Sequence, residues 1–399
     1  MRSPYRFNLL ELSGSLGDLG TLLPLAIGMI MINGLSPAGV LLTVGLYYVM
    51  SGLYFGVTVP VQPMKVIGAY AVATAVSASQ LMAAGLLIGV FLLVIGATGL
   101  MTIIGRYIPK QVVRGVQVAT GTLLIGQGVK FIMGSSSFQV AQAAAEPYLT
   151  LQHLGPIPIG IVFGIIGGIT TLWFLNNKRF PAGLIVVLAG LVLGLFLGTR
   201  QGFDTLRLGL YLPGWLPFGL PSWTDLSLAC LILVFPQIPM TLGNAVMAYV
   251  DLSHQYFGEQ SQRVTYKASC ISMGLVNLLC ASVGGMPLCH GAGGLAAHYR
   301  FGARTPGSNL LIGFVFVGLA LFLGEHALSI IYLIPLSVLG VLLIYSGTQL
   351  AMTLIDMRTR RELFVVFVML GITLAVNLAV GFIAGIGLAY LLKSERLSV

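Results

Sequence analysis

The sequence predicts an all-α polytopic membrane protein of fourteen transmembrane elements, arranged as a 7+7 inverted repeat that contains two half-helices. Three observations predict this fold: the composition, the spacing of long apolar runs, and a proline-containing pattern that occurs once in each half. Of the 399 residues, 57% are hydrophobic and 8% are charged, whereas about 25% of the residues of a soluble domain are charged. We therefore expect a lipid bilayer to surround most of the chain.

Glycine content and charge distribution fit the same interpretation. Of the 399 residues, 52 are glycine, a share nearly twice the average usage of about 7%. Small residues let membrane helices approach one another closely. The net charge is +9, but the basic residues form short clusters between apolar runs and no continuous stripe. This distribution is typical of membrane-surface loops, so we do not expect nucleic acid as a partner.

The apolar runs give the predicted spans, because a transmembrane helix needs about 20 mostly apolar residues. The full-length spans are predicted at 8–32, 38–58, 80–104, 111–133, 157–175, 181–198, 226–250, 262–283, 307–324, 327–352, 361–377 and 379–392. Two shorter apolar pieces, 63–78 and 287–299, each open with proline after a glycine- or proline-rich stretch. We interpret both as half-helices that enter from the middle of the membrane.

Positive charge predicts the orientation. With the N-terminus inside, the Lys and Arg residues fall mostly in inner connections, and Lys130, Arg200 and Arg207 are the exceptions. Cytoplasmic loops normally carry this excess, so both termini are predicted to be cytoplasmic, with a bacterial inner membrane as the expected location. The first apolar stretch contains Glu11 and Asp18, which excludes a cleavable signal peptide.

The irregular segments of the two halves match each other. LLPLAIG at 22–28 precedes QPMKVIGAYAVA at 62–73, and QIPMTLG at 237–243 precedes MPLCHGAGGLAA at 286–297. An odd number of elements in each half turns the second half upside down relative to the first. Inverted repeats of this kind place their broken helices face to face near the membrane midplane, where transporters bind substrates.

The chain is therefore predicted to consist of a first repeat at 1–199, an extracellular connection at 200–225 and a second repeat at 226–399. Only KSERLSV follows the last span, so no soluble domain is expected after the membrane part.

The half-helices predict a binding site for a small anion. A helix N-terminus carries unpaired N–H groups and about half a positive charge, so two such ends that face one spot attract an anion. Pro63 and Pro287 are predicted as first helical residues, where the missing N–H costs nothing. Lys65 then lies in a first turn, where a cation is unfavourable without an anion beside it. The alternatives for Lys65 are an ion pair with Asp18 and extension to the membrane interface.

Uncharged polar residues flank the same breaks. The candidate hydrogen-bond donors to the anion, each of which also suits a structural hydrogen bond, are Thr21, Gln62, Gln237, Thr241 and Asn244. Cys289 and His290 are predicted in the first turn of the second half-helix, followed by Gly291, which allows close backbone approach. His290 is interpreted as a donor to the anion, as a titrating group, or as a buried core residue.

Two carboxylates in the first span are candidates for ion coupling. Asp18 and Glu11 are seven residues apart, so they share one helix face. A carboxylate inside a span is costly unless it is paired, protonated or used for coupling. We expect Asp18 to couple transport to an ion or to pair structurally, and we place Glu11 near the inner interface.

Four blocks of sequence resemble a known family. They are ELSGSLGDLGTLLPL, VPVQPMKVIGAYAVA, PMTLGNAVMAYVDL and GGMPLCHGAGGLAAHYRFGART, and together they are similar to the molybdate transporter family related to the SulP sulfate permeases. The resemblance implies high-affinity molybdate uptake and a core and a gate domain that move relative to each other. It also implies binding motifs at Gln62, Pro63, Met64 and Lys65 and at Gly243, Asn244, Pro287, Cys289, His290 and Gly291. A typical SulP permease carries a C-terminal STAS domain, and its absence from this sequence favours the molybdate branch.

The predicted function is secondary active uptake of molybdate, with sulfate or another oxyanion such as tungstate as the alternative cargo. A nucleobase permease, a channel and a membrane enzyme are less favoured alternatives. No HExxH or GxSxG motif occurs, so we expect no enzymatic activity, and neither a cofactor nor a metal is predicted. The expected partners are molybdate, the lipid bilayer and a second copy of the chain in a homodimer.

Overall fold

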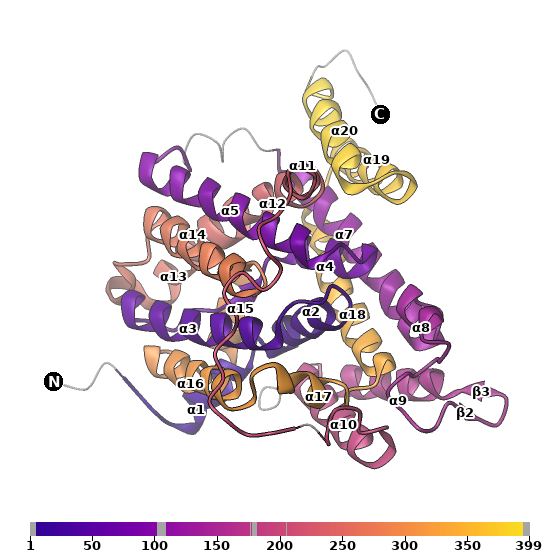
Figure 1. The fold of residues 1–399 in the computed structure, drawn as a ribbon. Coiled ribbons are helices and arrows are strands. Elements are labelled where there is room, and N and C mark those ends of the chain that lie inside the picture. The colour runs from indigo at the N-terminus through magenta and orange to yellow at the C-terminus, as the bar shows by residue number, and fades with distance from the viewer. Residues whose placement is uncertain (1–4, 102–108, 176, 178–181, 205, 394–399) are drawn as a thin grey trace.

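The computed structural model describes residues 5–101, 109–175, 177, 182–204 and 206–393, and these residues are mostly helical (Figure 1). The helices up to residue 200 are α1 (Leu9–Leu16), α2 (Leu19–Met31), α3 (Pro37–Phe55), α4 (Lys65–Thr74), α5 (Ala78–Thr98), α7 (Lys110–Met133), α8 (Ser137–Ala141), α9 (Ile159–Phe174) and α10 (Ala182–Leu197). Residues 1–4 and 394–399 lie outside the described part, as do residues 102–104 of the span predicted at 80–104 and residue 181 of the span predicted at 181–198.

The second half is also helical. Its elements are α11 (Trp223–Leu228), η1 (Ala229–Val234), α12 (Phe235–Met240), η2 (Thr241–Ala248), α13 (Tyr249–Phe257), η3 (Gly258–Ser261), α14 (Tyr266–Val283), α15 (Ala292–Phe301), α16 (Pro306–Leu323), η4 (Gly324–His326), α17 (Ala327–Ile331), α18 (Leu336–Ala351), η5 (Met352–Asp356), α19 (Arg360–Ala375) and α20 (Leu378–Leu391). The strands are β1 (Gln62–Pro63), β2 (His153–Leu154), β3 (Ile157–Pro158) and β4 (Leu288–Cys289). These short strands and an isolated β-bridge between Leu149 and Gly198 depart from the predicted all-α fold.

The helices are long and apolar enough for an integral membrane protein. Among the described residues, seven helices could cross a membrane, or eight if the bent pair of α1 and α2 is counted as one span. Several predicted spans differ from the structure. The spans predicted at 157–175, 181–198 and 379–392 are the shorter apolar helices Ile159–Phe174, Ala182–Leu197 and Leu378–Leu391. The segment predicted at 8–32 is broken by a bend of 47°, the segment predicted at 327–352 is divided into α17 and α18, and the segment predicted at 226–250 is part of a helix over Trp223–Ser261.

The bend between α1 and α2 falls at Gly17 and Asp18. A Cβ on Gly14 would collide with the backbone of Ala303, and one on Gly17 would lie 2.6 Å from the Phe301 ring. The end of α1 is therefore held directly against α15 and the loop that follows α15. Asp18 accepts the backbone N–H groups of Thr21 and Leu22 through its carbonyl oxygen and begins α2.

Three helix pairs join segments that are distant in sequence: α3 packs along α16, α5 along α14, and α7 along α18. Glycines make each contact close. A Cβ on Gly45 would lie 2.7 Å from a backbone nitrogen of α16, one on Gly89 would lie 3.1 Å from the Gly274 oxygen, and one on Gly121 would lie 2.5 Å from the Gly347 oxygen. The high glycine content is thus used for packing of backbone against backbone.

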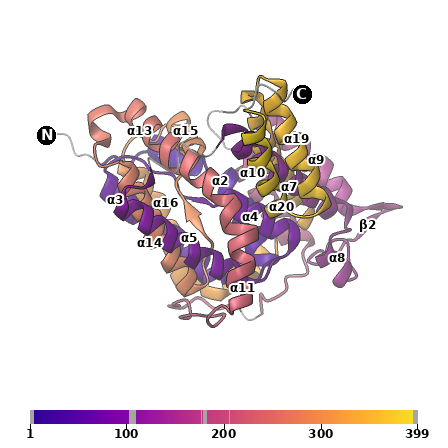
Figure 2. The ribbon, with the colours of Figure 1, turned by 90° about the horizontal axis from the view of Figure 1, so that it is seen from above.

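The helices form two groups. In Figure 1 and Figure 2, α3, α5, α13, α14 and α16 gather on one side, and α7, α9 and α20 gather on the other. Helices α2 and α4 lie between the two groups in both views. This arrangement leaves the two half-helices and the bend before α2 next to the junction of the groups.

Strands β1 and β4 bring the half-helices together. They pair in antiparallel fashion, with Gln62 opposite Cys289 and Pro63 opposite Leu288, and the Met64 N–H donates to the Pro287 oxygen at 2.8 Å. The prediction that Pro63 and Pro287 are the first helical residues is wrong, because the paired strands keep both segments extended. Helix α4 begins at Lys65 and α15 begins at Ala292.

Two buried carboxylates hold helix starts in place. Glu11 accepts hydrogen bonds from the backbone N–H groups of Arg304 at 3.0 Å and Thr305 at 3.2 Å, just before α16. Glu146 accepts the N–H groups of Leu336 and Ser337, both at 2.8 Å, at the start of α18. The Glu11 side chain is only 2% exposed, and its bonds give it a structural role; its place near the inner interface stays a prediction.

Candidate functional site

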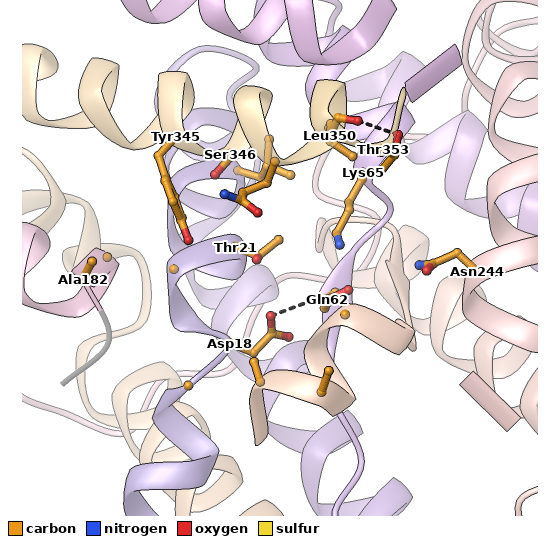
Figure 3. Close-up of a pocket in the computed structure, with 18 of the residues that line it drawn as sticks. Asp18, Thr21, Gln62, Lys65, Ala182, Asn244, Tyr345, Ser346, Leu350 and Thr353 are labelled. Atoms are coloured by element: carbon orange, nitrogen blue, oxygen red, sulfur yellow. Dashed lines mark hydrogen bonds between the residues drawn. The ribbon is translucent and has the colours of Figure 1, made fainter. Parts of the chain in front are cut away.

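A cavity of about 430 Å³ lies where the half-helices meet α2, α7 and α18 (Figure 3). The polar side chains that line it are Asp18, Thr21, Gln62, Lys65, Gln117, Asn244, Arg300, Tyr345, Ser346, Gln349 and Thr353. Five of the predicted site residues are therefore brought together: Asp18, Thr21, Gln62, Lys65 and Asn244. The two halves of the chain both contribute to this lining, as the repeated motifs predicted.

Lys65 is the first residue of α4, and its side chain points into the cavity (Figure 3). A Cβ on Gly293, in the first turn of α15, would lie 3.9 Å from the Lys65 Nζ. Among the described residues the only ion pair joins Arg114 to Asp356. No carboxylate is therefore in direct contact with the Lys65 ammonium, although Asp18 lines the same cavity and interacts with it electrostatically. The predicted position of Lys65 in the first turn is confirmed, and the alternative of an ion pair with Asp18 is not.

Asp18 and Gln62 form a buried pair at the bottom of the same cavity. The Gln62 Nε2 donates to Asp18 Oδ1 at 2.6 Å, and the two residues are only 1% and 3% exposed. The second carboxylate oxygen of Asp18, Oδ2, and the carboxamide oxygen of Gln62, Oε1, have no hydrogen-bond partner among the described residues. A buried unpaired oxygen is costly, so this pair is an unusual arrangement for a purely structural contact.

The N-terminus of α4 is already capped. The Gln237 Oε1 accepts the backbone N–H groups of Val66 at 3.0 Å and Ile67 at 3.1 Å, and its Nε2 donates to Thr241 Oγ1 at 2.9 Å. Gln237 and Thr241 are therefore occupied with each other and with α4, and the prediction that they donate to the substrate is not supported.

The N-terminus of α15 is open. Its N-cap residue, Gly291, has no side chain, and within the described part of the chain no side chain accepts the N–H groups of Ala292, Gly293 or Gly294. The first turn of α15 approaches Lys65 at Gly293, and an uncapped helix N-terminus favours an anion.

Replacing Gln237 by alanine is expected to destabilise α4. The substitution leaves the Val66 and Ile67 N–H groups without their acceptor, and loss of a helix cap costs about 0.5–2 kcal/mol. The thermal unfolding temperature of the detergent-solubilised protein should fall, whereas that of Gln349→Ala, which removes an exposed carboxamide, should stay near the wild-type value. Equal unfolding temperatures for Gln237→Ala and the wild type would contradict the capping role.

His290 is held away from the cavity. Its Nε2 lies 2.7 Å from the Tyr47 hydroxyl and its Nδ1 lies 3.0 Å from the Pro60 oxygen. Its ring stacks between Tyr47 and Tyr249, with centroid distances of 4.8 and 5.0 Å. Of the three interpretations of His290, the structure supports the buried core residue.

The other predicted residues near β4 also lie outside the lining. Cys289 is buried with its Sγ 3.7 Å from the Pro63 oxygen, Met64 is 1% exposed, and Gly291 packs against Gln62 so closely that a Cβ would collide with Oε1. Cys289 and His290 precede α15, so their predicted place in its first turn is wrong. Their extended backbone in and after β4 is the physical reason.

Several lining residues were not among the predicted ones. Gln117 accepts hydrogen bonds from Arg114 at 2.8 Å and Thr353 at 3.1 Å, and its Nε2 lies 3.5 Å from the Met240 sulfur, so it connects α7 with α12 and η5. Arg300 adds a second cation at the end of α15. Gln117 lies inside an apolar span, and a polar residue in that position is a signal that would have identified it.

The sequence of the chain is similar to those of known transporters over nearly its whole length. The profile of the family described as "Molybdate transporter of MFS superfamily" matches residues 10–124 and 229–350. Molybdate transporter 1 of Arabidopsis thaliana is 31% identical over 96% of this chain and 87% of that protein. Molybdate transporter 2 of the same plant is 32% identical over 97% and 88%, and Molybdate transporter 1 of Chlamydomonas reinhardtii is 30% identical over 94% and 90%.

Solved structures resemble the fold over nearly the whole chain. The transmembrane domain of the cyanobacterial bicarbonate transporter BicA has a TM-score of 0.66 at 17% identity, covering 94% of this chain and 96% of that domain. SLC26A9 also has a TM-score of 0.66, at 14% identity, covering 96% of this chain and 65% of that protein. The chain therefore shares its fold with these two solved structures.

Proposed function

This chain belongs to the molybdate transporter family, and we propose that it carries molybdate across a membrane by binding the oxyanion in the cavity between α4 and α15. The proposed contacts are the Lys65 ammonium, the open N–H groups at the start of α15, and the side chains of Thr21, Gln62 and Asn244. The family consists of transporters and not of enzymes. The proposal extends this family function to a named site.

The observation that carries the proposal is the Lys65 ammonium, which faces the open N-terminus of α15 without a paired carboxylate. Two positive groups that face one space are unfavourable unless an anion fills it. A tetrahedral oxyanion offers acceptors in several directions, so it can bind an ammonium and backbone N–H groups together. The 430 Å³ cavity leaves room for such an ion and for ordered water.

Competition for uptake tests the cargo. Purified protein in liposomes should accumulate labelled molybdate, and protein-free liposomes serve as the control. Tungstate should compete best, because it matches molybdate in shape and charge, and sulfate should compete less well. Stronger competition by sulfate would support the alternative of a sulfate permease, and competition by uracil would support a nucleobase permease.

We also propose the 7+7 inverted repeat with a core and a gate domain. The pairing of α3 with α16 and of α5 with α14 supports it. With the short helices α4 and α15 counted, α3 and α14 are the second predicted elements of their halves and α5 and α16 are the fourth, so each pair joins a second element to a fourth element of the other half. The core would contain α1 to α5 and α11 to α16, and the gate would contain α7 to α10 and α17 to α20. Both termini would be cytoplasmic.

Secondary active uptake is the transport mode that we propose, with the cavity as the single substrate site. The homodimer and the bacterial inner membrane stay predictions, and the relatives named above come from a plant and an alga. Access of substrate from alternate sides would follow from movement of the core against the gate, since residues of both line the cavity.

A further inference from the structure

The buried side chains of Asp18 and Gln62 pack tightly against the first turn of α15 as well as against each other. A Cβ on Gly294 would lie 2.5 Å from Asp18 Oδ2 and 2.7 Å from Gln62 Nε2, so the first turn of α15 lies directly against both groups. The same turn carries the N–H groups assigned to the oxyanion. A change in the protonation or orientation of the Asp18 and Gln62 side chains therefore alters the surroundings of the proposed anion site.

The orientation of the Gln62 carboxamide depends on the charge of Asp18. An ionised carboxylate only accepts hydrogen bonds, so Gln62 turns its Nε2 towards Asp18 Oδ1. The Gln62 Oε1 is then left without a partner beside Gly291, where Asn244 Nδ2 lies 3.6 Å from the Cβ position of that glycine. An unpaired acceptor oxygen at this place repels an oxyanion.

A protonated Asp18 reverses this arrangement. A carboxylic acid has one O–H donor, which can bond to the carboxamide oxygen of Gln62 in place of the present Nε2 contact. The carboxamide then turns its Nε2 towards α15 and Asn244, where an anion can accept from it. The proton comes from the aqueous phase and binds to one carboxylate oxygen, and no other bond is made or broken.

We infer that Asp18 and Gln62 form a proton switch, in which the oxyanion binds together with one proton that is carried on Asp18. The inference rests on the proposed molybdate site and identifies the coupling ion as a proton. It also has an electrostatic reason, because a dianion and an ionised Asp18 would place three negative charges around the Lys65 ammonium. Protonation of Asp18 removes one of them from a buried site.

Asp18 is the only carboxyl group among the described residues that line the cavity. Its charged, titratable and polar neighbours come from several elements. They are Lys65 from α4, Gln62 from β1, Thr21 from α2, Tyr48 from α3, Cys289 from β4, and Arg300 and Tyr345 in the cavity lining. A metal cation is less well suited than a proton to the space beside Asp18, because the Lys65 ammonium and Arg300 share the cavity with it.

Proton uptake on binding is the direct test. Molybdate is added to the purified protein in weak buffer with a pH indicator, and the affinity for molybdate is measured from mildly acidic to mildly alkaline pH. At mildly alkaline pH, where Asp18 is ionised in the empty protein, the wild type should take up about one proton per molybdate. Over the same pH range its affinity should fall up to about tenfold per pH unit. Asp18→Asn should bind molybdate without proton uptake and with a flat pH profile.

Glu11→Gln is the matched control, because Glu11 is a second buried carboxylate of the same bent segment that does not line the cavity. It should take up protons as the wild type does. Binding by the wild type without proton uptake overturns the inference, as does proton uptake by Asp18→Asn equal to that of the wild type. If Asp18→Asn does not fold, the proton count of the wild type decides alone. Absence of molybdate binding by the wild type contradicts the proposed function instead.

Discussion

Lys65→Met is expected to abolish high-affinity molybdate binding and uptake. The side chain is the only cation at the start of α4, and it faces the open N-terminus of α15. Loss of one partner from a buried, hydrogen-bonded charge contact costs about 2–5 kcal/mol, which corresponds to an affinity loss of about thirtyfold or more. The dissociation constant of the purified variant and its uptake rate in liposomes measure the effect.

Two further variants separate the position of the charge from the net charge of the protein. Lys130→Met removes an exposed cation near the end of α7 and should leave molybdate affinity near the wild-type value. Lys65→Arg keeps the charge but presents a planar group, so it should restore part of the affinity. Wild-type affinity in Lys65→Met, with correctly folded protein, would rule out the proposed site.

Gly294→Ala is expected to give the second large loss. The added methyl group would lie 2.5 Å from Asp18 Oδ2 and 2.7 Å from both Gln62 Nε2 and the Pro60 side chain, so these groups would have to move apart. Overpacking typically costs about 1–3 kcal/mol, and here it also separates the Asp18 and Gln62 pair from α15. Uptake should fall at least about tenfold, as initial rates in liposomes would show.

The matched control for this variant is Gly126→Ala on α7. A Cβ at Gly126 would meet no atom within 4 Å, and alanine stabilises a helix interior by about 1 kcal/mol relative to glycine. Its uptake should equal that of the wild type. Equal uptake by Gly294→Ala and Gly126→Ala would show that the contact between α15 and the Asp18 and Gln62 pair does not matter for transport.

The sequence was sufficient for features that depend on rare residues in apolar surroundings. Lys65 and Asp18 are charges inside spans, which are costly enough to indicate a site without any knowledge of tertiary contacts. The half-helices were recognisable because proline and glycine interrupt an otherwise continuous apolar run. These local signals located the cavity before the arrangement of the helices was known.

Other features could not be predicted, because they depend on partners far away in the chain. Gln237 caps a helix that begins 172 residues earlier, and β1 and β4 pair across a similar separation. His290 has the residue type of a substrate ligand, and only its stacking between two tyrosines shows that it belongs to the core. A hydrogen-bonding side chain next to a broken helix can either bind substrate or hold the fold together, and the sequence alone does not distinguish these two roles.

Paired glycines let the backbones of α7 and α18 pack in direct contact. Cβ atoms on Gly121 and Gly347 would each lie 2.5 Å from the carbonyl oxygen of the other residue, and the same reciprocal contact joins Gly128 to Gly340 at 2.5 and 2.6 Å. A shift of either helix by one residue would press a side chain into the opposite backbone. The two helices are consequently expected to move together as one rigid unit. Movement during transport is therefore expected to carry α7 and α18 together, and to change their contacts with α4 and α2 instead of the contact between them.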